Sequence, residues 1–346
     1  MVLCKDRIYN DYVFKCEVAD SRASNYYGNP ASIQIPYALN PFYTGRHYQP
    51  EPNFLSWLYP MYQPAISSSV PDGATTSSES KQQKIACGVG PASPPQRKTP
   101  TVGIVGGSEA VPNSWPFVVG LRKSGFNGVF CGGSLISTTR ILTAASCVNK
   151  LSAYDISTMT VSLGMHKQGN LPDTVNDAQQ TRRVSRVVYH KDYNDATFLF
   201  DVAVLTIEPS ISYSKAISPV CLPPASTAVD PFIGKDAAVM GWGLQSYDAT
   251  QTPNALQQVT VKVISLEDCN VPYKNTIKRQ QICAKADGKD SCVFDGGSPL
   301  VVQRSGSSWT QAGIVSFGEG CADATFPGVY ANVAFFRNWI NTYMNS

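Results

Sequence analysis

Short apolar runs separated by turn residues dominate the chain from residue 104 onward. The runs are rich in Val, Ile, Leu and Phe, and Gly, Pro, Asn and Asp separate them. This pattern predicts antiparallel β-structure. We expect strands at 116–122, 129–137, 140–145, 159–166, 183–190, 201–207, 237–243, 257–264, 299–303, 309–318 and 328–333. These strands are too many for one small sheet and require two packed sheets or barrels.

The pattern changes at the C-terminal end of the chain. Within 333–344, apolar residues recur at spacings of three and four, namely Phe335, Phe336, Trp339, Ile340 and Tyr343. This is the period of an amphipathic helix. We therefore expect a closing helix that docks its apolar stripe on the strands.

The first part of the chain shows neither pattern. It holds nine of the seventeen tyrosines, many Pro and Asn residues and a Ser/Thr-rich stretch at 67–80. Such a composition is typical either of a Tyr/Pro-rich binding tract or of an extended, weakly ordered segment, and we expect the second. The chain then divides into a low-order extension (1–86), a linker or activation-type segment (87–103) and a folded domain (104–346).

Length and charge narrow the classes of function. The chain has 346 residues, of which 43% are hydrophobic, enough for a substantial core in one or two globular units. Its apolar stretches fall far short of the roughly 20 residues that a bilayer span requires, so we expect no membrane-spanning segment. The 28 basic and 25 acidic residues are mixed along the chain and give a net charge of +3. We therefore expect no nucleic-acid partner and no anionic membrane surface as a partner.

Ten cysteines indicate the compartment. None forms a CxxC pair, and the only histidines are His47, His166 and His190, so we expect no metal and no cofactor. Scattered cysteines in an even number predict disulfides and a secreted, extracellular protein. No signal peptide is visible, because charges occur within the first seven residues and no apolar segment follows. We expect that the N-terminus here is mature or incomplete, and that Cys4 and Cys16 close a small local loop.

A series of motifs in collinear order spans 104–346. The motifs are IVGG, WPFVV, CGGSLIS, LTAASC, DVAVL, GWG, DGGSPL, SFGEGC and PGVY. Together they resemble the chymotrypsin-like serine peptidase family. The resemblance implies an all-β fold of two packed antiparallel six-stranded β-barrels with a C-terminal helix and an active cleft between the barrels. We expect a largely disordered extension before this domain.

The resemblance also implies a pairing of cysteines that spacing alone does not give, since eight cysteines allow 105 pairings. The implied pairs are Cys131 with Cys147, Cys269 with Cys283, Cys292 with Cys321, and Cys87 with Cys221. The last pair would keep the extension attached to the domain after a cleavage between them.

The catalytic positions depart from the pattern of the family. Peptide hydrolysis in this family uses a serine nucleophile, a histidine base and a buried carboxylate that orients the histidine. The resemblance places Ser146 at the base, Asp201 at the carboxylate and Gly296 at the nucleophile. A serine hydroxyl cannot act as a base near neutral pH, because its pKa lies far too high. We therefore expect no catalytic residue, and we expect Ser146 to be a hydrogen-bond partner of the buried Asp201.

Two neighbouring positions give no rescue. Ser298 lies two residues after Gly296, and a tight turn would point its side chain elsewhere. Phe294 replaces the glycine whose backbone amide helps to bind the oxyanion in the family, and a Cβ restricts the backbone there. None of the three histidines is placed to replace the base.

The specificity pocket of the family is retained more fully. The resemblance assigns to it Tyr273, Asp290, Ser291, Gly318 and Gly328, and the carboxylate of Asp290 would select Arg or Lys. The pocket either still accepts a basic side chain or is an inherited scaffold that the bulky Phe294 occludes. Phe317 stands where the family usually has Trp.

The activation switch of the family is present at both ends. Cleavage before Ile104 would free an ammonium group that pairs with Asp295 and orders the pocket. The preceding residue is Gly103, however, so a trypsin-like activator would cut after Arg97 or Lys98 and leave surplus residues. We expect that the usual processing does not occur.

These observations favour a catalytically inactive serine protease homologue, a pseudoprotease. The resemblance implies that it binds a protease, zymogen or inhibitor as a cofactor or regulator of an extracellular proteolytic cascade, including immune and clotting-type cascades. The alternative is an active serine endopeptidase that cleaves after Arg or Lys. A third possibility is an adhesive or matrix protein whose function lies in the Tyr/Pro-rich extension.

Overall fold

The computed structural model divides the chain into two units, Met1–Ser77 and Ser78–Ser346. It describes residues 2–3, 17–18, 86–91, 107–126, 128–169, 178–226, 231–244, 251–285, 295–304, 308–318 and 325–344. In the first unit, β1 (Val2–Leu3) pairs antiparallel with β2 (Glu17–Val18), and Leu3 lies opposite Glu17. The predicted low order of the extension and the predicted loop between Cys4 and Cys16 fall outside the described residues.

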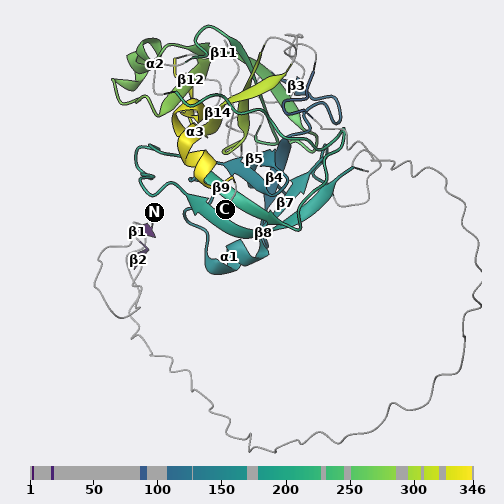
Figure 1. Cartoon of the computed structure of the whole chain (residues 1–346). Coiled ribbons are helices and arrows are strands. Elements are labelled where there is room, and N and C mark those ends of the chain that lie inside the picture. Colours follow the sequence, from purple (N-terminus) through teal and green to yellow (C-terminus); the bar gives the residue numbers. More distant parts are fainter. Residues whose placement is uncertain are drawn as a thin grey trace, which may run out of the picture. The chain divides into compact units, whose positions relative to one another are not determined.

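The first half of the second unit is a closed antiparallel barrel (Figure 1). Its strand order is β4-β5-β6-β9-β8-β7. The strands are β4 (Val118–Arg122), β5 (Cys131–Ser137), β6 (Arg140–Thr143), β7 (Thr160–Leu163), β8 (Gln180–Tyr189) and β9 (Ala203–Glu208). Fully buried Phe117, Leu121, Leu135 and Leu163 contribute to its core. Burial of these side chains is the main stabilising contribution to such a barrel.

The second half forms another barrel in the strand order β10-β13-β14-β15-β12-β11, which the pairing of β10 with β11 closes. Its strands are β10 (Asp236–Gly241), β11 (Gln257–Ile264), β12 (Gln281–Lys285), β13 (Pro299–Gln303), β14 (Trp309–Phe317) and β15 (Gly328–Asn332). The short β3 (Ser108–Glu109) adds to the edge of β11. The prediction of two six-stranded antiparallel barrels is therefore confirmed.

The expected strands correspond to β4 through β11 and to β13 through β15. The sequence reasoning missed β12, which the second barrel needs for closure. Its sequence QICAK contains one β-branched residue and is flanked by polar residues, so it lacks a strand signal of its own. Hydrogen bonding to β11 on one side and β15 on the other stabilises β12 as a strand despite its weak local preference.

In the part of the chain that the structure describes, three helices accompany the barrels: α1 (Ala153–Thr158), α2 (Leu266–Tyr273) and α3 (Val333–Thr342). The predicted closing helix is α3. The side chain of Asn332 caps it by accepting a hydrogen bond from the N–H of Phe335. Phe336 and Ile340 are buried, and Trp339 and Tyr343 pack partly buried against the same core. Among the described residues, no helix is long and apolar enough to cross a membrane.

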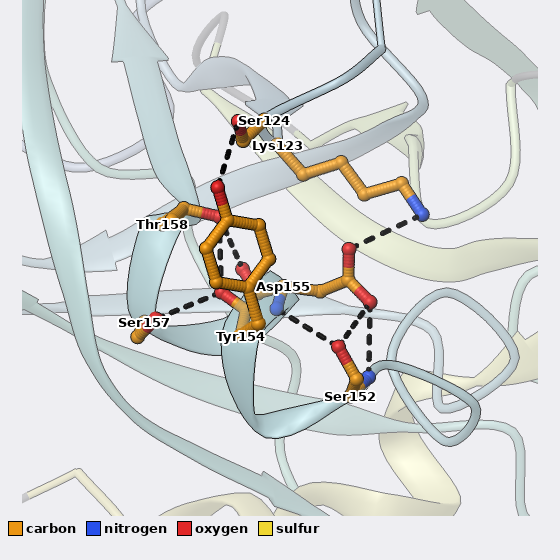
Figure 2. A network of polar contacts seen from close by, with 7 residues as sticks. All are labelled: Lys123, Ser124, Ser152, Tyr154, Asp155, Ser157 and Thr158. Atoms are coloured by element: carbon orange, nitrogen blue, oxygen red, sulfur yellow. Dashed lines mark hydrogen bonds and ion pairs between the residues drawn. The ribbon is translucent and has the colours of Figure 1, made fainter. Parts of the chain in front are cut away.

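A capping box begins α1. The hydroxyl of Ser152 accepts a hydrogen bond from the N–H of Asp155, and the N–H of Ser152 donates to the Asp155 carboxylate (Figure 2). The same carboxylate lies 3.9 Å from Nζ of Lys123. Because Lys123 follows β4, these contacts connect α1 to the β4–β5 turn.

Within the described ranges, three disulfides link Cys87 with Cys221, Cys131 with Cys147, and Cys269 with Cys283. They are the same pairs that the resemblance implies. The pair Cys292 with Cys321 falls outside the described residues.

The segment 86–91 is anchored on the barrels. The N–H of Gly88 donates to the carbonyl of Pro219 at 2.8 Å, and its carbonyl accepts the N–H of Trp309 at 2.8 Å. The indole N–H of Trp309 donates to the carbonyl of Pro91. Gly88 has φ = 74°, a left-handed conformation that favours glycine. These bonds and the Cys87–Cys221 disulfide hold the segment 86–91 on the barrels.

Candidate functional site

Asp201 is the buried acid at the centre of the site. It lies directly before β9 and is 1% exposed. Its Oδ1 accepts the backbone N–H of Ser146 at 2.7 Å, and its Oδ2 accepts the hydroxyl of Ser146 at 2.9 Å. The hydroxyl of Ser316, in β14, donates to the same Oδ2 at 2.6 Å. Because Ser146 follows β6 and Ser316 belongs to the second barrel, one carboxylate connects the two barrels.

Opposing effects act on the pKa of Asp201. Burial raises the pKa, because a charge in an apolar environment loses its hydration. Hydrogen bonds from Ser316 and Ser146 lower it, because they favour the carboxylate. Burial has the larger effect, so the pKa of Asp201 lies above its usual range.

The two hydrogen bonds from Ser146 to the Asp201 carboxylate confirm the expected role of Ser146 as a partner of Asp201.

The Tyr193 hydroxyl, which donates to Asp195, lies close to this pair. Burial raises the pKa of Tyr193, and the carboxylates of Asp201 and Asp195 raise it further. The phenol therefore stays neutral and is a donor at physiological pH.

Gly296 lies beside the end of the loop that carries Ser146. Its carbonyl accepts the N–H of Gly132 at 2.8 Å. A Cβ placed on Gly296 would lie 3.7 Å from the sulfur atoms of both Cys131 and Cys147, an ordinary contact distance. Since Cys147 is the neighbour of Ser146, the fold brings positions 146, 201 and 296 together. A small side chain fits at position 296.

The next two residues, Gly297 and Ser298, are tightly packed and leave no space for a larger side chain. Gly297 has φ = 82°, and a Cβ there would overlap Oγ1 of Thr143 and the carbonyl oxygen of Gly132. Ser298 is 1% exposed, and its hydroxyl has no hydrogen-bond partner among the described residues. This hydroxyl packs where a Cβ on Gly132 would be, at the contact between the barrels. Ser298 therefore points into the protein and away from a substrate.

Asp295 is fully buried against the turn that ends β10. Its Oδ1 accepts the N–H of Gly243 at 2.8 Å. A Cβ on Gly241 or on Gly243 would overlap the carboxylate, so this turn needs glycines for the acid to approach. Ile104, the other predicted end of the activation switch, falls outside the described residues.

Part of the predicted specificity pocket is described. The hydroxyl of Tyr273 donates to the carbonyl of Pro327 at 2.8 Å, directly before Gly328. Phe317 of β14 lies opposite Val329 of β15, so Gly318 and Gly328 follow at the same end of these two strands. The structure therefore brings Tyr273, Gly318 and Gly328 together. Asp290, Ser291 and Phe294 fall outside the described residues.

An aromatic stack next to this pocket was missed in the sequence. The ring of Phe317 stacks on Phe198 with centroids 5.1 Å apart, and its edge contacts Tyr273 at 6.0 Å. Phe198 has φ = 53°, and the side chain of Asn194 holds its loop by accepting N–H bonds from Ala196 and Thr197. The aromatic residues of the stretch FLFD, directly before Asp201, are the signal that marks this loop.

Ser316 and Tyr193 were missed as well. Ser316 lies in the quoted motif SFGEGC, but its contact with Asp201 joins residues 115 positions apart. Only the packing of the two barrels reveals this contact. Tyr193 lies eight residues before Asp201 in the sequence, and this spacing alone does not predict that the two side chains lie close together.

The described histidines have other partners. Nε2 of His166 lies 2.9 Å from Oε1 of Glu109, and the imidazole is 2% exposed. The ring of His190 stacks on Phe200 at 4.8 Å and contacts Trp339. His47 falls outside the described residues. No group of three or more His, Cys, Asp or Glu side chains suited to a metal ion occurs in the described part of the chain.

Comparison with known proteins covers the two barrels. Residues 104–340 match the family model described as Trypsin. The chain is 36% identical to Trypsin alpha of Drosophila melanogaster over 246 residues, which are 70% of this chain and 88% of that relative. It is 35% identical to Trypsin delta of the same species over 261 residues, 74% of this chain and 94% of that relative.

Proposed function

Because this chain belongs to the trypsin family, we propose that it is a member without peptidase activity, a pseudoprotease that acts by binding another protein. The observation that carries the proposal is the hydrogen bonding of Ser146. At the position of the general base stands a hydroxyl that donates to Asp201. A group that donates its proton to a buried carboxylate, and has a pKa far above neutrality, takes no proton from a nucleophile.

The nucleophile position supports the same proposal. Gly296 has no side chain, and the nearest hydroxyl along the chain belongs to the buried Ser298. An attacking oxygen must lie about 3–3.5 Å from the scissile carbonyl carbon, with a lone pair directed at that carbon. Ser298 does not offer this geometry.

A binding role fits the parts of the site that remain. Tyr273, Gly318 and Gly328 lie together, and Phe317 adds an aromatic surface next to them. With Asp290 as the predicted acid of the pocket, the preferred ligand is a protein segment that carries Arg or Lys. The proposed partner is a protease, a zymogen or an inhibitor, and the proposed role is that of a cofactor or regulator of an extracellular cascade.

The disulfides support a place outside the cell. Three disulfides occur among the described residues. Such bonds form and persist in oxidising compartments and are rare in the cytosol. We propose that the protein is secreted.

The test is hydrolysis of an Arg ester and a Lys amide by the purified chain. The comparison is a restored variant, Ser146→His, Phe294→Gly and Gly296→Ser, with both proteins assayed uncut and after cleavage before Ile104. In an unrelated serine protease, loss of the triad lowers turnover by about 10⁶. We expect no turnover above background for the natural chain and a gain of activity in the restored variant. The matched control, Ser146→His, Phe294→Gly and Gly296→Ala, lacks the nucleophile, so turnover that persists in this variant comes from a contaminating protease.

Turnover that belongs to the natural chain would overturn the proposal and favour the alternative, an active endopeptidase that cleaves after Arg or Lys.

A second measurement tests binding. A small inhibitor protein with Lys in its binding loop is titrated calorimetrically into the uncut and cleaved forms. Binding without cleavage of the loop is expected, and no binding to either form would contradict a binding role for this site.

A further inference from the structure

A groove of about 520 Å³ lies on the second barrel, away from every residue of the site described above. This volume is in the range of sites that hold a ligand of several hundred daltons. Val302 of β13 lines the groove and belongs to the buried cluster of this barrel, and Phe232 lines it and packs against that cluster. The groove therefore opens where the core of the barrel ends.

Prolines form much of the wall. Pro223 and Pro224 follow Cys221, and Pro231 lies beside Phe232. Proline has no backbone N–H and a fixed φ, so this wall is rigid and offers few hydrogen-bond donors. A ligand that covers the wall needs apolar surface.

Two cations lie at the rim of the groove. Lys235 lies directly before β10, and Arg304 lies directly after β13, its paired neighbour. Both residues line the groove. Both residues are exposed, and neither side chain forms an ion pair with an acidic residue in the described part of the chain. The nearby Asp236 faces Lys262 instead, at 3.7 Å. Two cations that line one groove repel each other, and an anion bound between them would remove this repulsion.

The floor of the groove contains a hydroxyl without a partner. Thr310 of β14 pairs with Val302, lines the groove and is 1% exposed. Its Oγ1 forms no hydrogen bond among the described residues. An unsatisfied buried hydroxyl is unfavourable, and a hydrogen bond to a polar ligand atom would remove this cost.

We propose that this groove binds an extended acidic segment of a partner protein, with an apolar residue on the proline wall and an Asp or Glu side chain between Lys235 and Arg304. Among the described residues that line the groove, two are cationic and none is acidic, so an acidic segment complements their charge. A small free carboxylate would satisfy the cations but leave the apolar wall uncovered. This surface is separate from the trypsin-like site, and it stands whether or not the chain hydrolyses peptides.

The probe is a fluorescein-labelled octapeptide that alternates Glu with Leu and Pro, and its twin has Gln at every Glu position. Binding to the full chain is followed by fluorescence anisotropy. The tested variant is Lys235→Glu with Arg304→Glu, and the matched control is Lys215→Glu, an exposed lysine that does not line the groove. We expect the Glu peptide to bind more tightly than its twin, to weaken with added salt and to lose at least tenfold in affinity in the double variant.

A charge exchange keeps the test independent of folding. The double variant is expected to bind a third peptide with Lys at the Glu positions, which also shows that it is folded. Equal binding of the Glu and Gln peptides, unchanged affinity in the double variant, or no binding below about 1 mM would overturn the proposal. Displacement by glutarate at the peptide's own concentration would also overturn it, in favour of a site for small acids. An aryl amidine directed at the predicted Asp290 pocket is expected not to compete, which separates this site from the proposed function.

Discussion

Ser146 donates both its backbone N–H and its hydroxyl to the carboxylate of Asp201, at 2.7 and 2.9 Å. One small residue thus satisfies an oxygen on each side of a buried acid. A buried carboxylate without donors would be strongly destabilising. The two hydrogen bonds from Ser146 therefore offset the cost of burying the Asp201 carboxylate, although no imidazole among the described residues lies beside it.

Removal of the third donor gives a pH-dependent loss of stability. The bond from Ser316 lowers the pKa of Asp201, so Ser316→Ala is expected to raise that pKa beyond the value to which burial already raises it. In the folded Ser316→Ala protein, Asp201 therefore holds its proton more tightly than in the folded natural chain. As pH rises through the pKa values of Asp201 in the two folded proteins, the free energy of unfolding of the variant falls further below that of the natural chain. We expect a loss of about 1.5–3 kcal/mol near neutrality and a smaller loss in acid, measured by urea unfolding at several pH values.

The control for this prediction is Ser298→Ala. The Ser298 hydroxyl is buried but has no hydrogen-bond partner among the described residues, so its removal is expected to change stability by the same amount at every pH. A loss in Ser316→Ala that is equally independent of pH would contradict the assigned bond to a carboxylate.

Adjacent glycines are expected to respond differently to substitution. Gly296→Ala places its methyl at ordinary contact distance from two sulfurs and requires no left-handed backbone, so the free energy of unfolding should change by less than about 1 kcal/mol. Gly297→Ala forces a methyl into Thr143 and into the backbone of Gly132 at φ = 82°, and should cost about 2 kcal/mol or more. Thermal and urea unfolding of the two variants measure the difference, and equal stabilities would contradict this geometry.

His190 is expected to remain neutral below its usual titration range. Burial lowers its pKa, and this effect exceeds the opposite effect of Asp192. Its Nδ1 accepts the N–H of Asp192, a bond that protonation would remove. Because the unfolded chain binds the proton more tightly, stability is expected to fall as pH drops from 6.5 towards the native pKa. Titration of the imidazole by NMR gives this pKa directly.

His190→Phe is the companion variant. It keeps an aromatic ring on Phe200 and Trp339 but removes the titrating group. We expect it to flatten the dependence of stability on pH below 6.5. If the slope in this range is unchanged, another group is responsible for it.

The anchor of the segment 86–91 is expected to depend on Gly88. A Cβ there would overlap the Trp309 carbonyl and lie 2.9 Å from Sγ of Cys221. Gly88→Ala should therefore loosen the segment and expose the Cys87–Cys221 disulfide, so that dithiothreitol reduces it faster. Gly125→Ala is the matched control, because its φ of 76° is similar but no atom lies within 4 Å of the added methyl.

The sequence allowed the architecture to be predicted wherever a strand carried its own apolar pattern. In β4, four of five residues are buried, and in α3 the apolar stripe becomes the docking face. The short β12 has no such pattern and depends on β11 and β15. The pairing of Ser146 with Asp201 was predictable because a buried acid needs a donor and the family motif placed this serine beside it.

Contacts between distant segments were not predictable. Ser316 reaches Asp201 only because the two barrels pack together, and Phe198 reaches Phe317 only through a left-handed backbone. Lys235 and Arg304 line the same groove because each flanks one of two paired strands, β10 and β13. Each of these relationships depends on tertiary geometry rather than on local preference.

The glycines at the contact between the barrels restrict how this chain can diverge. Gly132 and Gly241 come from different barrels, and a Cβ on either would press on the hydroxyl of Ser298. Drift under selection for folding alone can therefore exchange the residue at position 296, where a methyl fits, but it is blocked at these glycines. In proteins that descend from this chain, Gly132 and Gly241 are therefore expected to be retained after the residues around position 296 have been substituted.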